Sequence, residues 1–227
     1  MRTSILAILV FFIMCSVSYA SDVYITQAGA SFTANINQDG QTNRYGVSGT
    51  VATHTGDNQT LDIDQIGNSN TIAASIIGAT QTFTLRQAGN SNTSTVTVGS
   101  NSAAADNSIV QTLTGSSNTT TVNVGTSAAS GDADIDLVAT GDSNTVTINE
   151  NSTATMIGSD KKVTSITLVG SSNTVTSTHA GAGDHDTTLA HTGASGAFVF
   201  TQDGIHDTTI SMITNGAGHN VTITVDD

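Results

Sequence analysis

Apolar and polar residues alternate with a period of two along most of the chain, and the alternating stretches end at glycines. Before Gly89, every second residue is apolar or an amide, in the order Phe83, Leu85 and Gln87, and the residues between them are polar. A period of two places successive side chains on opposite faces of a strand, whereas a helix would repeat every 3.6 residues. The pattern therefore predicts β-strands with one buried face.

The spacing of the glycines predicts how these strands stack. Gly67, Gly78 and Gly89 are eleven residues apart, which is the length of one strand and a tight turn, and two such halves form a rung of about 22 residues. Repeats of this length are typical of stacked repeat proteins. The sequence predicts an all-β protein, a β-solenoid of about eight strand–turn–strand rungs with two facing parallel sheets. Extra residues in some rungs are expected in loops at one edge of the stack: Gly99–Asn107, Gly125–Ala133 and Glu150–Lys162.

A motif, Gln-x-Gly-x-x-Asn, recurs complete or shortened in most rungs. Its Gln and Asn have the parity of the buried face, where an amide must be hydrogen-bonded. Stacked in successive rungs, the amides can bond to one another in ladders with a repeat of about 4.8 Å. The predicted ladder residues are Gln38, Asn43, Gln65, Asn70, Gln87, Asn92, Asn118, Asn144, Asn173 and Gln202. The predicted turn glycines, expected to supply the positive φ of tight turns, are Gly40, Gly67, Gly89, Gly115, Gly141, Gly170 and Gly204.

The first twenty residues have the features of a secretory signal peptide. Arg2 supplies the positive start, Ile5–Cys15 is an apolar run, and Ser18–Ala20 has the small-x-small pattern of a cleavage site. The apolar run is too short to cross a bilayer as a helix, so we expect no stable membrane insertion. The chain is therefore predicted to comprise a signal peptide, residues 1–20, and a single secreted repeat domain, residues 21–227.

Composition and charge narrow the function further. Lys and Arg number 5 against 18 acidic residues, a formal net charge of −13, which repels nucleic acid. Paired carboxylates at Asp62 and Asp64, and at Asp134 and Asp136, have the parity of an outward face. There they are expected to be solvated and to oppose sideways association of the sheets. We expect no enzyme activity and no cofactor.

The motif carries a family resemblance. Gln38–Asn43, Gln65–Asn70 and Gln87–Asn92, flanked by alternating strands on an exported chain, resemble the curlin repeat family, the subunits of curli amyloid fibres. The resemblance implies a structural subunit that assembles with copies of itself into an extracellular amyloid-like fibre, by end-to-end stacking of rungs, in a biofilm matrix or in adhesion. It also implies a curli-type secretion pore and a nucleator as partners, and it makes the ladder residues the self-assembly residues.

Outward threonines provide a second hypothesis. Thr-x-Thr pairs at equal distances after the motif glycines would form two straight columns on one face of the stack. Such a face resembles the ice-binding surface of β-solenoid antifreeze proteins, although threonine also stabilises ordinary exposed strands. The candidate ice-facing residues are Thr93, Thr95, Thr119, Thr121, Thr145, Thr147, Thr174 and Thr176. A third hypothesis is a non-polymerising β-solenoid adhesin, or a segment of a surface or phage fibre, that binds glycans through its variable loops.

Histidines and aspartates gather in the C-terminal third of the chain. His185, His191 and His206 have aspartates beside them or nearby in sequence, and histidine with carboxylate is a ligand set that zinc prefers. These three histidines are candidate metal ligands. Exposed turn residues would give the same pattern, and the expectation from sequence is that no metal is bound.

Overall fold

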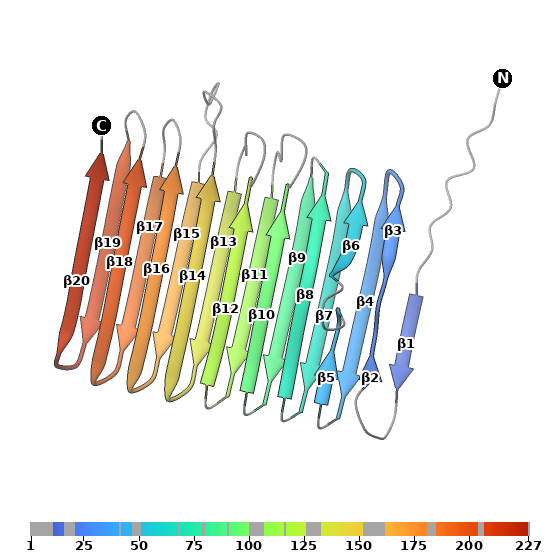
Figure 1. Cartoon of the computed structure of the whole chain (residues 1–227), viewed down its shortest axis with the longest axis horizontal. Coiled ribbons are helices and arrows are strands. Elements are labelled where there is room, and N and C mark those ends of the chain that lie inside the picture. Colours follow the sequence, from blue (N-terminus) through green and yellow to red (C-terminus); the bar gives the residue numbers. More distant parts are fainter. Residues whose placement is uncertain are drawn as a thin grey trace.

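The computed structural model describes residues 11–15, 21–40, 42–46, 51–67, 69–78, 80–89, 91–99, 107–115, 117–125, 133–151, 162–180, 185–203 and 207–226. The regular secondary structure of these residues consists of β-strands, and neighbouring strands pair in parallel. The strands lie side by side in a slab that runs from the N-terminal to the C-terminal end of the chain (Figure 1). The predicted all-β fold, a β-solenoid with two facing parallel sheets, is confirmed.

Sheet 1 contains the strands that precede the motif turns. In order across the sheet they are β1 (Phe11–Cys15), β4 (Phe32–Asp39), β7 (Gln59–Ile66), β9 (Gln81–Ala88), β11 (Asn107–Thr114), β13 (Ala133–Thr140), β15 (Lys162–Val169), β17 (His185–Thr192) and β19 (Thr208–Asn215). The first of these, β1, lies within the predicted signal peptide and pairs with β4.

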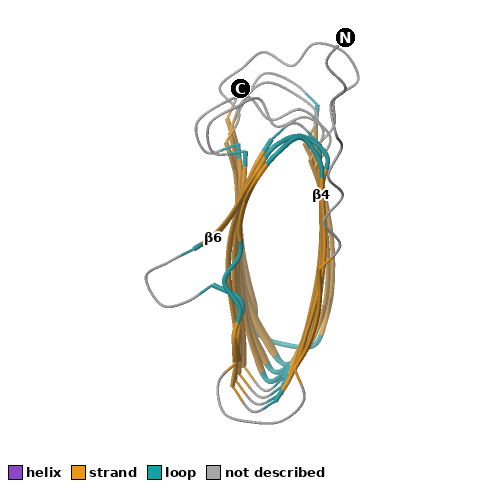
Figure 2. Cartoon of the chain, turned by 90° about the vertical axis from the view of Figure 1, so that its right-hand side faces the viewer, coloured by secondary structure: helices purple, strands orange, loops and turns teal. Residues whose placement is uncertain are grey.

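Sheet 2 contains the strands that follow those turns. It begins with the short strands β2 (Ser21–Asp22) and β3 (Thr26–Ala28), which pair with β5 (Thr42–Arg44) and β6 (Ala52–Thr55) respectively. It continues with β8 (Ser69–Ile77), β10 (Ser91–Val98), β12 (Ser117–Val124), β14 (Ser143–Asn151), β16 (Ser172–Ala180), β18 (Ser195–Asp203) and β20 (His219–Asp226). Viewed along the stack, the two sheets face each other and converge at both edges (Figure 2).

The solenoid has about six turns, slightly fewer than the eight rungs predicted. From the β7–β8 pair to the β17–β18 pair, each turn has a neighbour on both sides. The first rung is interrupted, because its second strand is divided into β5 and β6, and the last pair, β19 and β20, has a neighbour on one side only. The difference in count therefore arises at the two ends of the stack.

The two edges of the slab differ in the length of their connections. At the motif edge, only two residues separate a strand of sheet 1 from the following strand of sheet 2, as between β7 and β8 or between β9 and β10. At the opposite edge the connections vary, from 78–80 to 152–161. The predicted insertions lie largely outside the described residues, and Glu150 and Lys162, predicted at the margins of one of them, are strand residues.

The space between the sheets is filled by alternate side chains, as the period of two predicts. Phe83, Leu85 and Gln87 of β9 are buried, as are Val96 and Val98 of β10. Register is constant from rung to rung, so each buried position becomes a column of side chains along the stack. A constant register keeps every apolar side chain on the core face, because a shift of one residue would reverse the faces of a strand.

The motif glycines are required for a reason other than the predicted one. Gly89, Gly115, Gly141 and Gly170 lack the positive φ expected of them, whereas Gly67 has a φ of 153°. Their backbones instead stack so closely that an added Cβ on Gly89 would lie 1.6 Å from the carbonyl oxygen of Gly67. The amide of each motif glycine donates to a carbonyl of the next rung, as Gly89 N does to Thr114 O at 2.8 Å. Gly204 lies outside the described residues.

Candidate functional site

The first candidate site is the glutamine ladder inside the N-terminal half of the stack. Gln65 Nε2 donates to Gln38 Oε1 at 2.5 Å, and Gln87 Nε2 donates to Gln65 Oε1 at 2.9 Å. All three side chains are buried. Gln87 Nε2 also donates to the carbonyl oxygen of Thr93, 3.2 Å away beyond the motif turn. Each amide therefore joins neighbouring rungs and also the two sheets of its own rung.

An asparagine ladder runs beside it, through a longer part of the stack. Asn92 donates to Asn118, Asn118 to Asn144 and Asn144 to Asn173. In each bond the distance from Nδ2 to Oδ1 is 2.7 Å. At the N-terminal end the direction is opposite, because Asn70 Nδ2 donates to Asn43 Oδ1 at 3.2 Å. The buried Oδ1 atoms of Asn70 and Asn92 consequently have no hydrogen-bond partner. The inward orientation predicted for these six asparagines is confirmed.

Gln202 was wrongly grouped with this set. It is buried, but it belongs to β18 of sheet 2, where it stacks on His179, and not to the column of Gln87 in sheet 1. That column continues as Leu113 and Ala139. The error arose because the sequence Gln202–Asp207 imitates the motif at the opposite edge of the slab. Between β17 and β18, the stacked turn glycine is Gly193.

The second candidate site is the end rung, formed by β19 and β20. Each of these strands pairs on one side only, with β17 and β18 respectively. Of its core-facing residues, Val221, Ile223 and Val225 in β20 are 36%, 50% and 53% exposed. Within the described residues no element covers this end. The end rung thus offers both unpaired backbone and apolar side chains.

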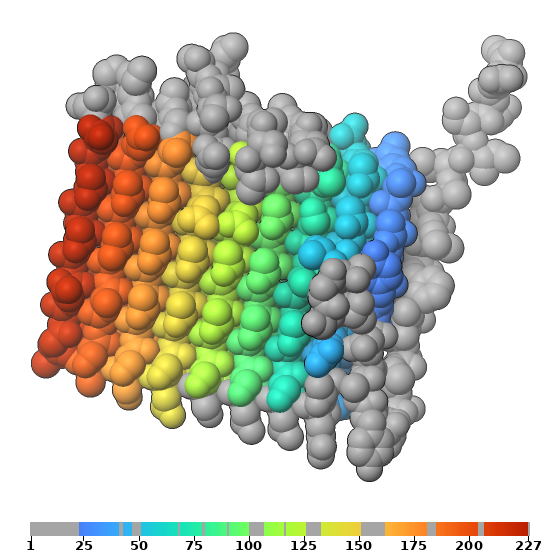
Figure 3. All heavy atoms as spheres, in the orientation of Figure 1, coloured from blue at the N-terminus to red at the C-terminus, as the bar shows by residue number. Residues whose placement is uncertain are grey.

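The third candidate site is the outer surface of sheet 2 between β8 and β16, termed here the hydroxyl face. In β10, β12, β14 and β16, the predicted threonines form two columns in register, with Thr93, Thr119, Thr145 and Thr174 in one and Thr95, Thr121, Thr147 and Thr176 in the other. In these strands of sheet 2 and in β8, all described outward residues are uncharged. Figure 3 shows this surface as rows of side chains that run across the strands.

Sheet 1 has a different outer surface. Its exposed or partly exposed residues include the predicted carboxylates Asp62, Asp64, Asp134 and Asp136. Arg86 Nη1 forms an ion pair with Asp64 Oδ2 at 3.0 Å. The two faces of the slab therefore differ in charge, and the carboxylates oppose close contact with a second sheet on the sheet 1 side only.

The predicted histidine cluster divides into separate sites. His185 faces the core from β17 near the edge of variable connections. His191 lies at the other end of the same strand and contacts Phe198 and His219, with ring centroids 5.1 and 4.9 Å away. His206 lies outside the described residues. His185 and His191 therefore do not contribute to a common metal site.

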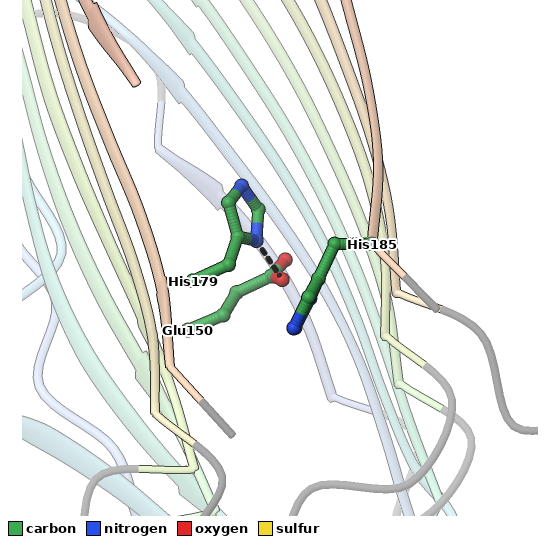
Figure 4. A group of neighbouring side chains, drawn as sticks. All are labelled: Glu150, His179 and His185. Atoms are coloured by element: carbon green, nitrogen blue, oxygen red, sulfur yellow. Dashed lines mark hydrogen bonds and ion pairs between the residues drawn. The ribbon is translucent and has the colours of Figure 1, made fainter. Parts of the chain in front are cut away.

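The structure instead brings His185 together with two residues that the sequence interpretation missed. Glu150 of β14 and His179 of β16 project from sheet 2 toward His185 on sheet 1 (Figure 4). The candidate ligand atoms of all three lie within 4.8 Å of one another, and the three side chains are buried. His179 Nδ1 is 2.5 Å from Glu150 Oε2. We refer to Glu150, His179 and His185 as the Glu–His cluster.

An extension of the parity count would have found this cluster. Glu150 and His179 lie nine residues after Gly141 and Gly170, the same distance that places Val98 on the core face after Gly89. The predicted insertion Glu150–Lys162 instead placed Glu150 in a loop. A carboxylate with the parity of the core is thus the signal that identifies the site.

Another buried polar pair lies at the N-terminal end of the stack. The Tyr45 hydroxyl and His54 Nε2 are hydrogen-bonded, and both residues are fully buried. Burial lowers the pKa of His54 to about 4, because the charged imidazolium loses its hydration. The same cause raises the pKa of Tyr45. The pair is therefore neutral near pH 7.

The first rung is expected to lose stability on mild acidification. Between pH 6.5 and about 4 the unfolded chain binds a proton at His54 and the folded chain does not, so folding is favoured fully above pH 6.5 and progressively less below it. From pH 6.5 to pH 5 the loss is about 2 kcal/mol. His54→Gln, which keeps an acceptor for Tyr45 but does not titrate, should show a smaller loss in denaturant unfolding at the two pH values. An equal loss in both proteins would contradict the assignment.

The fold defines the class of protein as a parallel β-solenoid. No protein-family model, no curated protein and no solved structure matches the chain. The described part of the chain has no helix of the length and apolar character needed to cross a membrane.

Proposed function

We propose that the protein is a structural subunit that assembles with copies of itself into an extracellular amyloid-like fibre, by stacking of rungs end to end. The observation that carries the proposal is the end rung. Solenoids that remain monomeric usually cover such an end, because unpaired backbone on a flat apolar rung is a template for another strand. Here β20 carries exposed apolar side chains on its core side, and Ile210 and Met212 on the core side of β19 are partly exposed.

The opposite end of the stack is a suitable acceptor. In the register shared by all internal rungs, Ile210, Met212 and Thr214 of β19 belong to the same columns as Ala34, Ile36 and Gln38 of β4. Stacking of β19 on β4 would continue these columns between chains. The outer edge of β4 accepts a parallel strand, since β1 pairs there. Removal of the predicted signal peptide would leave this edge open.

Sheet 2 can continue in the same way. In the shared register, β20 would place Ile223 on Ala52 and Val225 on His54 of β6. The segments β2 and β3 now occupy that edge, but they are only two and three residues long. Their displacement would cost few hydrogen bonds, whereas each stacked rung adds two full-length strand pairings. We therefore place the growing ends at β19–β20 and at β4–β6.

The test is assembly of the chain from Ser21 onward at micromolar concentration and neutral pH. We expect fibres after a lag, shortening of the lag by preformed fibres, and diffraction spacings near 4.8 and 10 Å, which are the distances between strands and between sheets. Light scattering and electron microscopy follow the same samples. A chain that stays monomeric for days under seeding would overturn the proposal.

A second function is favoured by one observation, the uncharged hydroxyl face. Its two threonine columns repeat at the strand spacing of about 4.8 Å and lie on a flat sheet, so their hydroxyl and methyl groups could order water in a lattice. Ice binding would require a soluble monomer. Thermal hysteresis in a stable monomer would support ice binding, whereas binding to a glycan array by such a monomer would support the adhesin hypothesis.

A further inference from the structure

We propose that the Glu–His cluster is a binding site for one zinc ion, held by Glu150, His179 and His185 between the two sheets. Two imidazoles and one carboxylate form a common ligand set of zinc. The inference is independent of fibre assembly, because the cluster lies inside a single chain and includes no residue of the end rung.

The ligands converge from three strands and both sheets. Glu150 and His179 are register partners in β14 and β16, while His185 reaches them from β17 across the core (Figure 4). Zinc bonds of about 2.0–2.2 Å place neighbouring ligand atoms of a tetrahedral site roughly 3.3–3.5 Å apart. Ligand atoms that now lie within 4.8 Å would need to close by about 1 Å, which rotation of side chains can supply. The ion would replace the hydrogen bond between His179 and Glu150.

Neighbouring hydroxyls hold two of the ligands in orientation. Ser177 Oγ lies 2.7 Å from His179 Nε2, which leaves Nδ1 directed at Glu150. Thr164 Oγ1 donates to Glu150 Oε1 at 3.1 Å, and this bond leaves Oε2 for an ion. Outer hydrogen bonds of this kind are typical of zinc sites, where they fix the ring nitrogen and the carboxylate that bind.

Gln202 packs beside His179 on the side of its Nε2 atom. It stacks on His179, its Nε2 donates to Thr187 Oγ1 at 3.4 Å, and Thr187 Oγ1 also lies 3.2 Å from His179 Nε2. Its Oε1 is buried and has no hydrogen-bond partner.

Packing of the fold does not require polar residues at these positions. In the preceding rungs, the column of Glu150 and His179 contains Val98 and Val124, and the fold is the same there. Replacing valine with a buried carboxylate costs folding free energy unless the charge is compensated. Lys162, which is also buried, supplies part of the compensation. Burial lowers the pKa of Lys162, and the negative charge of Glu150 opposes this lowering. A bound cation would supply more.

The site is enclosed, so zinc is expected to enter while the chain folds. Purified protein should therefore be unfolded, refolded with and without zinc at pH 7.5, dialysed, and analysed for metal. We expect one zinc per chain and a higher midpoint of thermal unfolding in the zinc-loaded protein. Refolding with Co²⁺ should give the visible absorption of a tetrahedral cobalt site with nitrogen and oxygen ligands.

Glu150→Gln and His185→Ala should each weaken zinc binding at least about tenfold, and far-UV circular dichroism verifies that they fold. His191→Ala is the matched control, because it removes a buried histidine of the same strand that lies outside the cluster, and it should bind zinc normally. If a cluster variant does not fold, the cobalt spectrum of the unaltered protein decides. Less than about 0.1 zinc per chain, unchanged binding by both cluster variants, or loss of binding in His191→Ala would overturn the proposal.

Discussion

Gly89→Ala is expected to destabilise the monomer by roughly 3 kcal/mol or more, at the upper end of what overpacking costs. The new Cβ would lie 1.6 Å from the Gly67 carbonyl oxygen and 2.6 Å from Asn70 Oδ1. The first of these is a backbone atom held in the rung below, so relief requires the two rungs to separate. That separation would also break the hydrogen bond from Gly89 N to Thr114 O or displace the rungs beyond it.

Gly40→Ala is the matched control for this substitution. Gly40 is the motif glycine of the first rung, and an added Cβ there has nothing within 4 Å. Its effect on the free energy of unfolding of the monomer should be within about 1 kcal/mol. Part of that effect is stabilising, because alanine lowers the conformational entropy of the unfolded chain. Guanidinium unfolding of both variants measures the difference. Equal stability of the two would show that the turns do not stack as described.

Ile223→Lys is expected to slow fibre growth at least about tenfold while it leaves the monomer folded. In the monomer this side chain is 50% exposed, so the ammonium group can remain hydrated and the cost should stay within about 1 kcal/mol. In a stacked pair the same side chain would be enclosed against the β6 strand of the next chain. A buried ammonium without a partner opposes the stacking strongly.

The control for the charge itself is Thr222→Lys. Thr222 precedes Ile223 in β20 and points to the outer surface of sheet 2, so the added charge stays in solvent in monomer and fibre alike. Seeded growth followed by light scattering compares the two variants at the same protein concentration and salt. If both grow at the rate of the unaltered chain, or both are slowed equally, stacking through the core side of the end rung is excluded.

Much of the fold could be predicted because the alternation is local and strict. Phe83, Leu85 and Gln87 reveal the buried face of one strand, and Gly89 marks its end, without any knowledge of the neighbouring rung. Parallel stacking follows, because the motif recurs at nearly constant intervals. The structure of the first rung could not be predicted in this way, because the division of its second strand into β5 and β6 follows no repeat.

The sites were predicted less completely because they depend on which rungs are neighbours. Gln202 and Gln87 precede the same motif letters but lie in different sheets, and the motif does not specify an edge of the slab. The reason for the glycines also lies between rungs, in the carbonyl that a Cβ would strike. Glu150 and His185 are 35 positions apart in sequence and meet only because β14 and β17 face each other across the core.

The unequal edges of the slab have a consequence for how this chain can vary. One residue added to a two-residue motif turn, such as 89–90, would reverse the faces of the strand that follows and expose its core. At the other edge, connections that range from 78–80 to 152–161 already join strands of identical register. Foreign peptides could therefore be inserted at that edge, and in a stacked assembly they would be displayed in a single line along its length.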